Sequence, residues 1–227
     1  MTSPNKFDES IRAAMVELVR GHAKDSALER TLASVTNSAV ELIDGVDFAD
    51  VLVMHEGQAR SAAPTAPGAV ELDSVQLRHR EGPCLEAAVN GAMIRCTDLR
   101  EDRRWPTFAK AAVGAGVLSM LSFQLVTHHN GVGALNLFGH APREADTAGE
   151  TMGALLATVA TVALMTAARE QQFETALASR DVIGQAKGIL MNHFKVDADH
   201  AFAMLKELSQ SQNTPLRLIA QRVIETF

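Results

Sequence analysis

The sequence predicts an α+β protein, in which a mixed or antiparallel sheet flanked by helices is followed by a long helix and a C-terminal bundle of three helices. Three observations predict this order. Short runs of aliphatic and β-branched residues alternate with amphipathic segments as far as Phe138. No proline occurs between Thr147 and Phe194, so a single helix can occupy this range. Three apolar stripes with helical spacing follow one another from Ser179 to Phe227.

The N-terminal part begins with helical patterns and then turns to strands. Residues 1–45 carry aliphatic side chains at three- and four-residue steps, which is typical of amphipathic helices. Residues 46–54 read VDFADVLVM and predict a strand. Residues 56–68 contain two glycines and two prolines, so we expect a turn and loop there. A short helix over 84–90 and a strand over 92–96 follow.

A second helix and a hairpin complete the predicted sheet. Trp105-Pro106 predicts a helix start, because proline is favoured at the first helical position. Strands over 117–127 and 132–138 flank His129-Asn130-Gly131. Asn-Gly between two apolar runs indicates a hairpin, since both residues tolerate positive φ.

The long helix carries an apolar stripe that needs a partner. We expect a homodimer, formed by a parallel coiled coil over Thr151–Leu177, although the stripe could instead pack on the sheet of its own chain. The longest apolar tract, 154–168, contains three threonines and predicts a buried helix, not a membrane span. The stripe consists of Leu155 or Leu156, Val159, Val162 or Ala163, Thr166, Phe173 and Leu177.

The last fifty residues predict a small bundle, because each of three helices has an apolar side to bury. The first helix spans Arg180–Met191, and Asp197 can cap the second. Thr214-Pro215 is expected to open the third. Phe194 and Phe202 fall on the apolar stripes and are expected to be buried.

The same segment contains three sequence blocks: IGQAKGILM from Ile183, AFxxLxxxS from Ala201 and NxxLxxxAxxV from Asn213. In this order and spacing they resemble the ANTAR domain. The resemblance implies binding to tandem RNA hairpins in transcript leaders and suppression of transcription termination. Lys187 lies in the Ala-Lys pair of the family's first helix, where it could reach a phosphate while Ala186 keeps the surface low. The candidate RNA-binding residues are Arg180, Gln185, Ala186, Lys187, Lys195, Ser209, Asn213 and Arg217. Ser209 and Asn213 could equally be ordinary helix-end residues. Phe194 and Phe202 could stack on a flipped base, although burial is the expectation for both.

Residues 25–165 resemble a GAF domain, a small-molecule sensor fold. The resemblance rests on EGPCLEAA at 81–88, on GALNLF at 133–138 and on a block between Asp102 and Phe108 that includes Trp105-Pro106. The expected organisation is an N-terminal helical extension (1–24), a GAF-like sensor (25–165), a helical linker or coiled coil (166–178) and an ANTAR domain (179–227).

A sensor pocket would lie between the sheet and the segment that covers it. Aromatic and methionine side chains could wall it, and arginines could bind an anionic ligand. Cys84 and Cys96 lack the spacing of metal ligands and are expected to be thiols, with Cys84 either a redox sensor or a buried structural residue. The candidate pocket residues are Arg95, Arg103, Arg104, Trp105, Phe108, Met120 and Phe123.

Charge and composition narrow the function further. The formal net charge of −6 counts against nonspecific binding to polyanions, and the last fifty residues are close to neutral. RNA would therefore be recognised by shape and by unpaired loop bases. The alternative is a sensor whose helical bundle docks a protein partner instead of RNA. Without a nucleophile elbow, a catalytic carboxylate pair or a signal peptide, we expect a cytoplasmic non-enzyme with no cofactor and no membrane partner.

Overall fold

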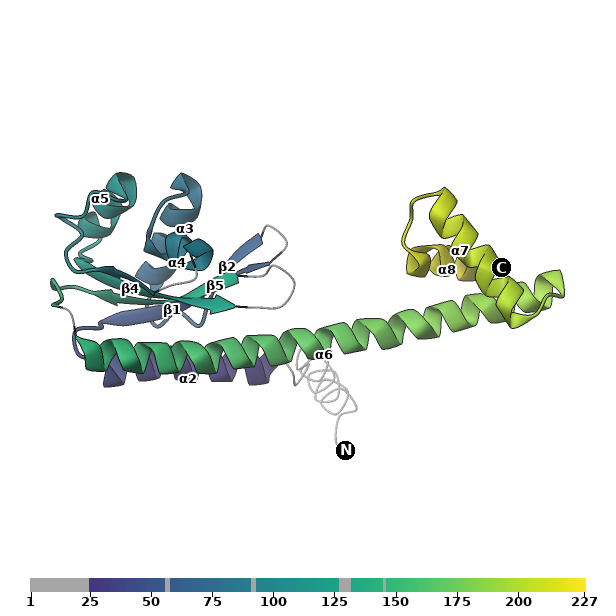
Figure 1. Ribbon diagram of the computed structural model, residues 1–227, viewed down its shortest axis with the longest axis horizontal. Coiled ribbons are helices and arrows are strands. Elements are labelled where there is room, and N and C mark those ends of the chain that lie inside the picture. Colours follow the sequence, from purple (N-terminus) through teal and green to yellow (C-terminus); the bar gives the residue numbers. More distant parts are fainter. Residues whose placement is uncertain (1–24, 56–57, 91–92, 127–131, 145) are drawn as a thin grey trace, which may run out of the picture. The chain divides into compact units, whose positions relative to one another are not determined.

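The computed structural model describes residues 25–227 except 56–57, 91–92, 127–131 and 145 (Figure 1). The chain divides into two compact units, one ending at Ala168 and the other beginning at Arg169. The expected extension over 1–24 and the expected turn at 129–131 lie outside the described residues. Each unit is described by itself below.

The first unit contains a five-stranded sheet in the order β2-β1-β5-β4-β3. Every neighbouring pair is antiparallel, which settles the choice between a mixed and an antiparallel sheet. The strands are β1 (Phe48–His55), β2 (Gln58–Ala62), β3 (Met93–Cys96), β4 (Ser119–Val126) and β5 (Val132–Gly139).

Strand β2 corrects the expectation of a loop over 56–68. It lies at the edge of the sheet, where all of its side chains except Ala62 are exposed or half-buried, and its sequence QARSA therefore lacks the aliphatic signal of a buried strand. Helix α3 (Pro67–His79) also begins inside the expected loop. Pro67 occupies the start of this helix, where its missing N–H costs nothing.

Helices cover both faces of the sheet (Figure 1). Helices α3, α4 (Pro83–Asn90) and α5 (Pro106–Gly114) lie on one face. Helix α2 (Asp25–Leu42) and the first part of α6 (Thr147–Phe194) lie on the other. Strand β1 shows the division, because Phe48 and Leu52 pack with the first group whereas Ala49 and Val51 pack with the second.

Helix α6 is continuous over 48 residues, as the absence of proline predicts. Its buried side carries Ala157, Ala160 and Leu164, which join the core formed with α2 and the sheet. Gly153 allows close packing there, since a Cβ would overlap the ring of Phe123. The sequence left packing on the sheet and packing against a partner as alternatives for this helix. One side of the helix packs on the sheet of its own chain, and another side exposes an apolar stripe.

The second unit contains the end of α6, helix α7 (Ala198–Ser211) and helix α8 (Leu216–Thr226). The three-helix bundle is confirmed, with a core of Ala186, Leu190, Ala201, Leu205, Ile219, Ala220 and Val223. Asp197 caps α7 by accepting hydrogen bonds from the backbone N–H groups of Asp199 (3.1 Å) and His200 (2.8 Å). Thr214 does not cap α8, because its hydroxyl donates to the carbonyl of Gln212 instead.

Two aromatic residues of the bundle were expected in its core and are not there. Phe202 is 40% exposed and Phe194 is 49% exposed. Phe202 follows the buried Ala201 by about 100° around α7, which turns its ring away from the core, and Phe194 is the last residue of α6.

Candidate functional site

An open groove with a cavity volume of about 980 Å³ lies between the end of α6 and the start of α7. It brings together three residues that the sequence singles out for RNA contact, namely Arg180, Gln185 and Lys187. Arg180 and Lys187, seven residues apart, come from the same side of α6, Gln185 lies about 160° from Lys187 around the helix, and α7 supplies Phe202. The groove is lined by Ala176, Ser179, Arg180, Asp181, Ile183, Gly184, Gln185, Lys187 and Phe202.

Lys187 and Phe202 form the central contact of the groove. The Lys187 ammonium lies 5.8 Å from the centroid of the Phe202 ring, within the range of a cation–π interaction. Lys187 is half-buried, so its aliphatic stem is packed while its charged end reaches the groove. Arg180, two helical turns earlier, adds a second positive charge, and Asp181 offsets part of it.

Gly184 lines the groove without a side chain, which leaves the backbone of α6 accessible there. A Cβ at Gly184 would meet no atom within 4 Å, and the same holds for Gly188 one turn later. Glycine in a helix interior is unfavourable by roughly 1 kcal/mol relative to alanine. Packing within the described residues therefore does not require either glycine.

Ala186 must be removed from the candidate contact residues. Its side chain is fully buried in the bundle core, because it lies on the same face of α6 as Leu190, one turn later. The Ala-Lys pair thus serves two purposes: Ala186 packs the helices together and Lys187 faces the groove.

The other four candidates lie outside the groove. Ser209 donates to the carbonyl of Thr214 (2.6 Å), and Asn213 adopts a positive φ of 47°, so both shape the turn between α7 and α8. Lys195 follows α6 with a φ of 55° and donates to Asn192 Oδ1 (3.3 Å). Arg217 is exposed on α8. As RNA contacts these four stay predictions, and the structure gives Ser209 and Asn213 a local structural role.

The sensor unit contains a buried polar network that the sequence reasoning missed. Asp50, Asn136 and Ser122 lie side by side on β1, β5 and β4, on the face covered by α3 and α4. Asn136 donates to Asp50 Oδ1 (2.9 Å) and accepts from the Ser122 hydroxyl (2.9 Å). The Ser61 hydroxyl donates to Asp50 Oδ2 (2.7 Å). These polar residues interrupt otherwise apolar strands, and this interruption is the feature of the sequence that could have predicted the network.

Asp73 of α3 joins this network by accepting a hydrogen bond from the Asn136 amide (3.4 Å). Burial, together with the neighbouring Asp50 carboxyl, raises the pKa of Asp73 to about 10. Burial also raises the pKa of Asp50. Asp73 Oδ2 has no hydrogen-bond partner among the described residues, which disfavours a negative charge on this carboxyl. The two carboxyl groups therefore hold a proton at neutral pH.

Both cysteines are buried thiols. Burial raises the pKa of Cys84 well above its usual range, and burial raises that of Cys96 to about 12. The redox interpretation of Cys84 needed a lowered pKa, so the structure favours the buried structural thiol.

The aromatic and methionine side chains that were expected to wall one sensor pocket do not lie together. Met120 and Phe123 are three residues apart on β4 and therefore face opposite sides of the sheet, Met120 towards α5 and Phe123 towards α6. Trp105 and Phe108 are buried in the same core as Met120. These four side chains cannot wall a single cavity.

The three expected arginines do not converge either. Arg95 pairs with Glu150 of α6, on the side of the sheet away from α3. Arg104 makes a two-pronged contact with Asp102 and lies 4.1 Å from the centroid of the Trp105 ring. Arg103 is exposed. A ligand on the α3 side of the sheet would meet the Asp50 network in place of the arginines.

Comparison with known proteins identifies both units. Residues 25–165 match the family model of the GAF domain, and residues 171–224 match that of the ANTAR domain. None of the curated proteins matches the chain. Among solved structures, GAF3 from Slr1393 of Synechocystis sp. PCC6803 in its photoproduct state is 13% identical, with a TM-score of 0.52, and the match covers 64% of this chain and 98% of that chain. Escherichia coli SdiA is 16% identical, with a TM-score of 0.51 and coverage of 94% and 95%. At these identities the two structures show the fold alone.

Proposed function

We propose that this chain, which belongs to the GAF family and continues into an ANTAR domain, acts in transcription antitermination. The two domains make it a regulator with a sensor domain and an RNA-binding output domain. In this proposal the bundle binds tandem RNA hairpins in transcript leaders, so that a terminator cannot form. The groove between α6 and α7, which Arg180, Lys187 and Phe202 line together, is the observation that carries the proposal.

The local charge of the groove matters more than the charge of the domain. Residues 179–227 contain six basic and five acidic side chains, so the bundle as a whole attracts RNA weakly. Two of the basic residues line one groove together with an amide and an aromatic ring. Phosphate binding by the cations and base contacts by Gln185 and Phe202 are the two kinds of contact that a hairpin loop requires.

Signals would reach the bundle through α6. This helix contributes Leu164 to the sensor core and Ala176 to the groove, and no residue between them interrupts it. We propose that an unidentified small ligand of the GAF domain changes how two copies of α6 pair.

Lys187→Ala tests the proposed contact with phosphate. In gel shifts of the full chain against tandem-hairpin RNAs, this variant should bind more weakly and equally so for different loop sequences. Its salt dependence should become shallower by about one charge. Thermal stability should change little, because exposed charged ends add little to folding.

Lys206→Ala is the matched control, since Lys206 is exposed on α7 but does not line the groove. Equal loss in both variants would argue against a specific site at Lys187. If the unaltered chain binds none of these RNAs, with or without cell extract, the bundle docks a protein partner instead.

A further inference from the structure

Phe202 differs from the other aromatic residues of the bundle in having no aromatic neighbour among the described residues. Phe194 and Phe227 meet edge to face, with ring centroids 6.4 Å apart, and His193 contacts both. Phe202, in contrast, is 40% exposed, and the group over its ring is the Lys187 ammonium. The exposed part of the Phe202 ring lies in a groove that also holds charged and amide groups, so a ligand that enters the groove can reach the ring.

The chemistry around Phe202 matches a single nucleobase. Each base has a π-face that can stack on an aromatic ring, and such stacking contributes about 1–3 kcal/mol per base. Gly184 leaves open space beside the ring, and the groove volume of about 980 Å³ accommodates a base with its sugar. The Gln185 amide offers both a donor and an acceptor, as a base edge requires.

We propose that one unpaired base of the hairpin loop stacks on Phe202, with Gln185 at its edge and Lys187 at a neighbouring phosphate. This inference rests on the proposed RNA-binding function and specifies which part of the RNA enters the groove. A base within the stem cannot occupy it, because its faces are already stacked on neighbouring pairs. The near-neutral bundle also needs a contribution to affinity that does not depend on charge, and stacking supplies one.

The test uses the full chain, a tandem-hairpin RNA that the unaltered chain binds, and copies of that RNA with an abasic site at each loop position in turn. Phe202→Leu keeps an apolar side chain but removes the aromatic face. It should weaken binding about 5- to 100-fold with an unchanged salt slope, unlike Lys187→Ala. Phe202→Trp should restore most of the affinity. Phe194→Leu, which alters a ring that is 49% exposed and does not line the groove, should bind normally.

The abasic RNAs identify the stacked base. One loop position should lose affinity with the unaltered chain but show no further loss with Phe202→Leu, because the two changes remove the same contact. Normal binding by Phe202→Leu, or an abasic loss that is equal in both proteins, would overturn the inference and leave the RNA-binding function standing. If no hairpin binds the unaltered chain, the function and the inference both fail, and thermal unfolding of Phe202→Leu separates misfolding from lost contact.

Discussion

Asp73 illustrates how position fixes the chemistry of a single residue. Its carboxyl lies between α3 and the central strands, where water is excluded and a second carboxyl, Asp50, is the neighbour. Ionising both groups would place two negative charges together in a medium of low polarity, so one proton is retained. Asn136 and Ser61 satisfy Asp50 with hydrogen bonds, which leaves Asp73 as the group that stays neutral.

We expect the sensor's stability to fall as pH rises, and Asp73→Asn to reduce this trend. The folded chain holds a proton on Asp73 up to a pKa of about 10, whereas the unfolded chain loses it near the ordinary value of 3.8. Between these values the folded state binds more protons, so its free energy of unfolding decreases with rising pH. Asparagine imitates the neutral carboxyl and has no proton to lose. Urea unfolding at about pH 5, 7 and 9 measures the slope.

Asp44→Asn serves as the control for that experiment, because Asp44 is exposed and lies outside the network. It should keep the slope of the unaltered chain. A slope that Asp73→Asn leaves intact would mean that Asp73 is already ionised in the folded state.

At the scale of single residues, spacing along the sequence separated core from surface only approximately. Lys187 lines the groove, whereas Ala186, a candidate contact residue, is buried in the core, and Phe202, expected in the core, is 40% exposed. Ala186 precedes Lys187 of the groove and Phe202 follows Ala201 of the core, and at each of these steps a rotation of about 100° decides between core and groove. The carboxyl pair was beyond reach, because Asp50 and Asp73 are brought together by a helix that was itself not predicted.

Among the elements, α6 carries two glycines whose effects can be separated. Gly184→Ala and Gly188→Ala should each raise the free energy of unfolding of the bundle by about 0.5–1 kcal/mol, because alanine favours the helix and its Cβ meets no atom. Gly184 lines the groove and Gly188 does not. Gly184→Ala should therefore weaken RNA binding while Gly188→Ala leaves it unchanged. Thermal unfolding and gel shifts on both variants check this, and equal RNA binding would exclude a close approach at Gly184.

The elements that the sequence predicted best are those whose burial is one-sided and regular. Apolar spacing predicts helices α6 and α7 and strands β1, β4 and β5. The residue type of Asp197 predicts the cap of α7. The sequence did not predict strand β2 or helix α3, for two different reasons. An edge strand needs few apolar residues, and Pro67-Gly68 suggested a loop although proline was serving as a helix start.

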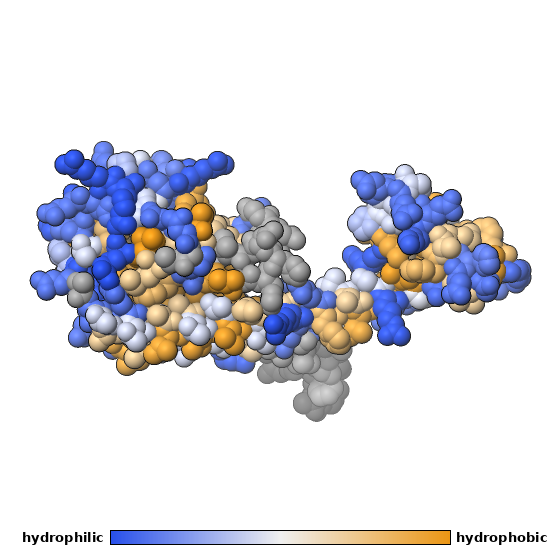
Figure 2. Space-filling model, in the orientation of Figure 1, coloured by the Kyte–Doolittle hydropathy of each residue, from blue (hydrophilic) through white to orange (hydrophobic). Residues whose placement is uncertain are grey.

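For the whole molecule, the outer side of α6 needs explanation. Figure 2 shows hydrophobic surface along this helix. Leu155, Val159 and Val162 are 58%, 49% and 58% exposed. By length and composition α6 could also cross a membrane, with a mean hydropathy of 1.7 over its most apolar window. Its opposite side, however, forms the core shared with α2 and the sheet, which a lipid-embedded helix could not do.

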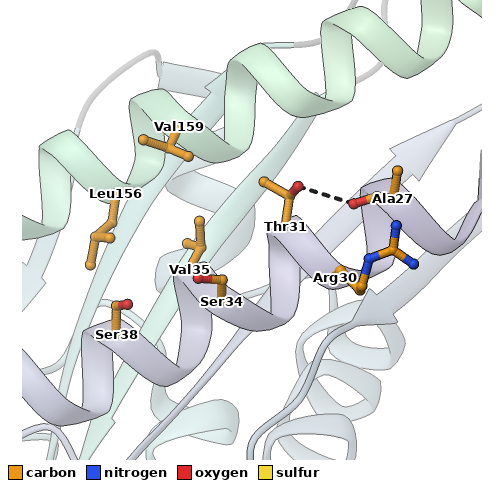
Figure 3. Close-up of a pocket in the computed structure, with 8 residues that line it drawn as sticks. All are labelled: Ala27, Arg30, Thr31, Ser34, Val35, Ser38, Leu156 and Val159. Carbon is orange, nitrogen blue, oxygen red and sulfur yellow. Dashed lines mark hydrogen bonds between the residues drawn. The ribbon is translucent and has the colours of Figure 1, made fainter.

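A second copy of the chain is therefore the proposed partner of this surface. Beside the stripe, α2 and α6 form a hollow of about 410 Å³, into which Val35, Leu156 and Val159 project (Figure 3). A side chain from a paired helix can fill this hollow while the two stripes meet, as in a helical bundle. The exposed residues Phe173 and Leu177 extend the same apolar character along α6, consistent with pairing over Thr151–Leu177.

Charges placed on this surface should separate the copies. Leu156 is half-buried in the chain's own core, so Val159→Glu with Val162→Glu is a cleaner change than one that includes Leu156. The double variant should stay folded and sediment as a monomer. It should bind a single hairpin normally but lose the added affinity for tandem hairpins, because two bundles no longer act together. Val70→Glu with Val89→Glu, at exposed valines on α3 and α4 across the sheet, should remain dimeric. If the Val159 and Val162 variant also remains dimeric, the copies pair elsewhere, and the exposed stripe of α6 must serve another partner.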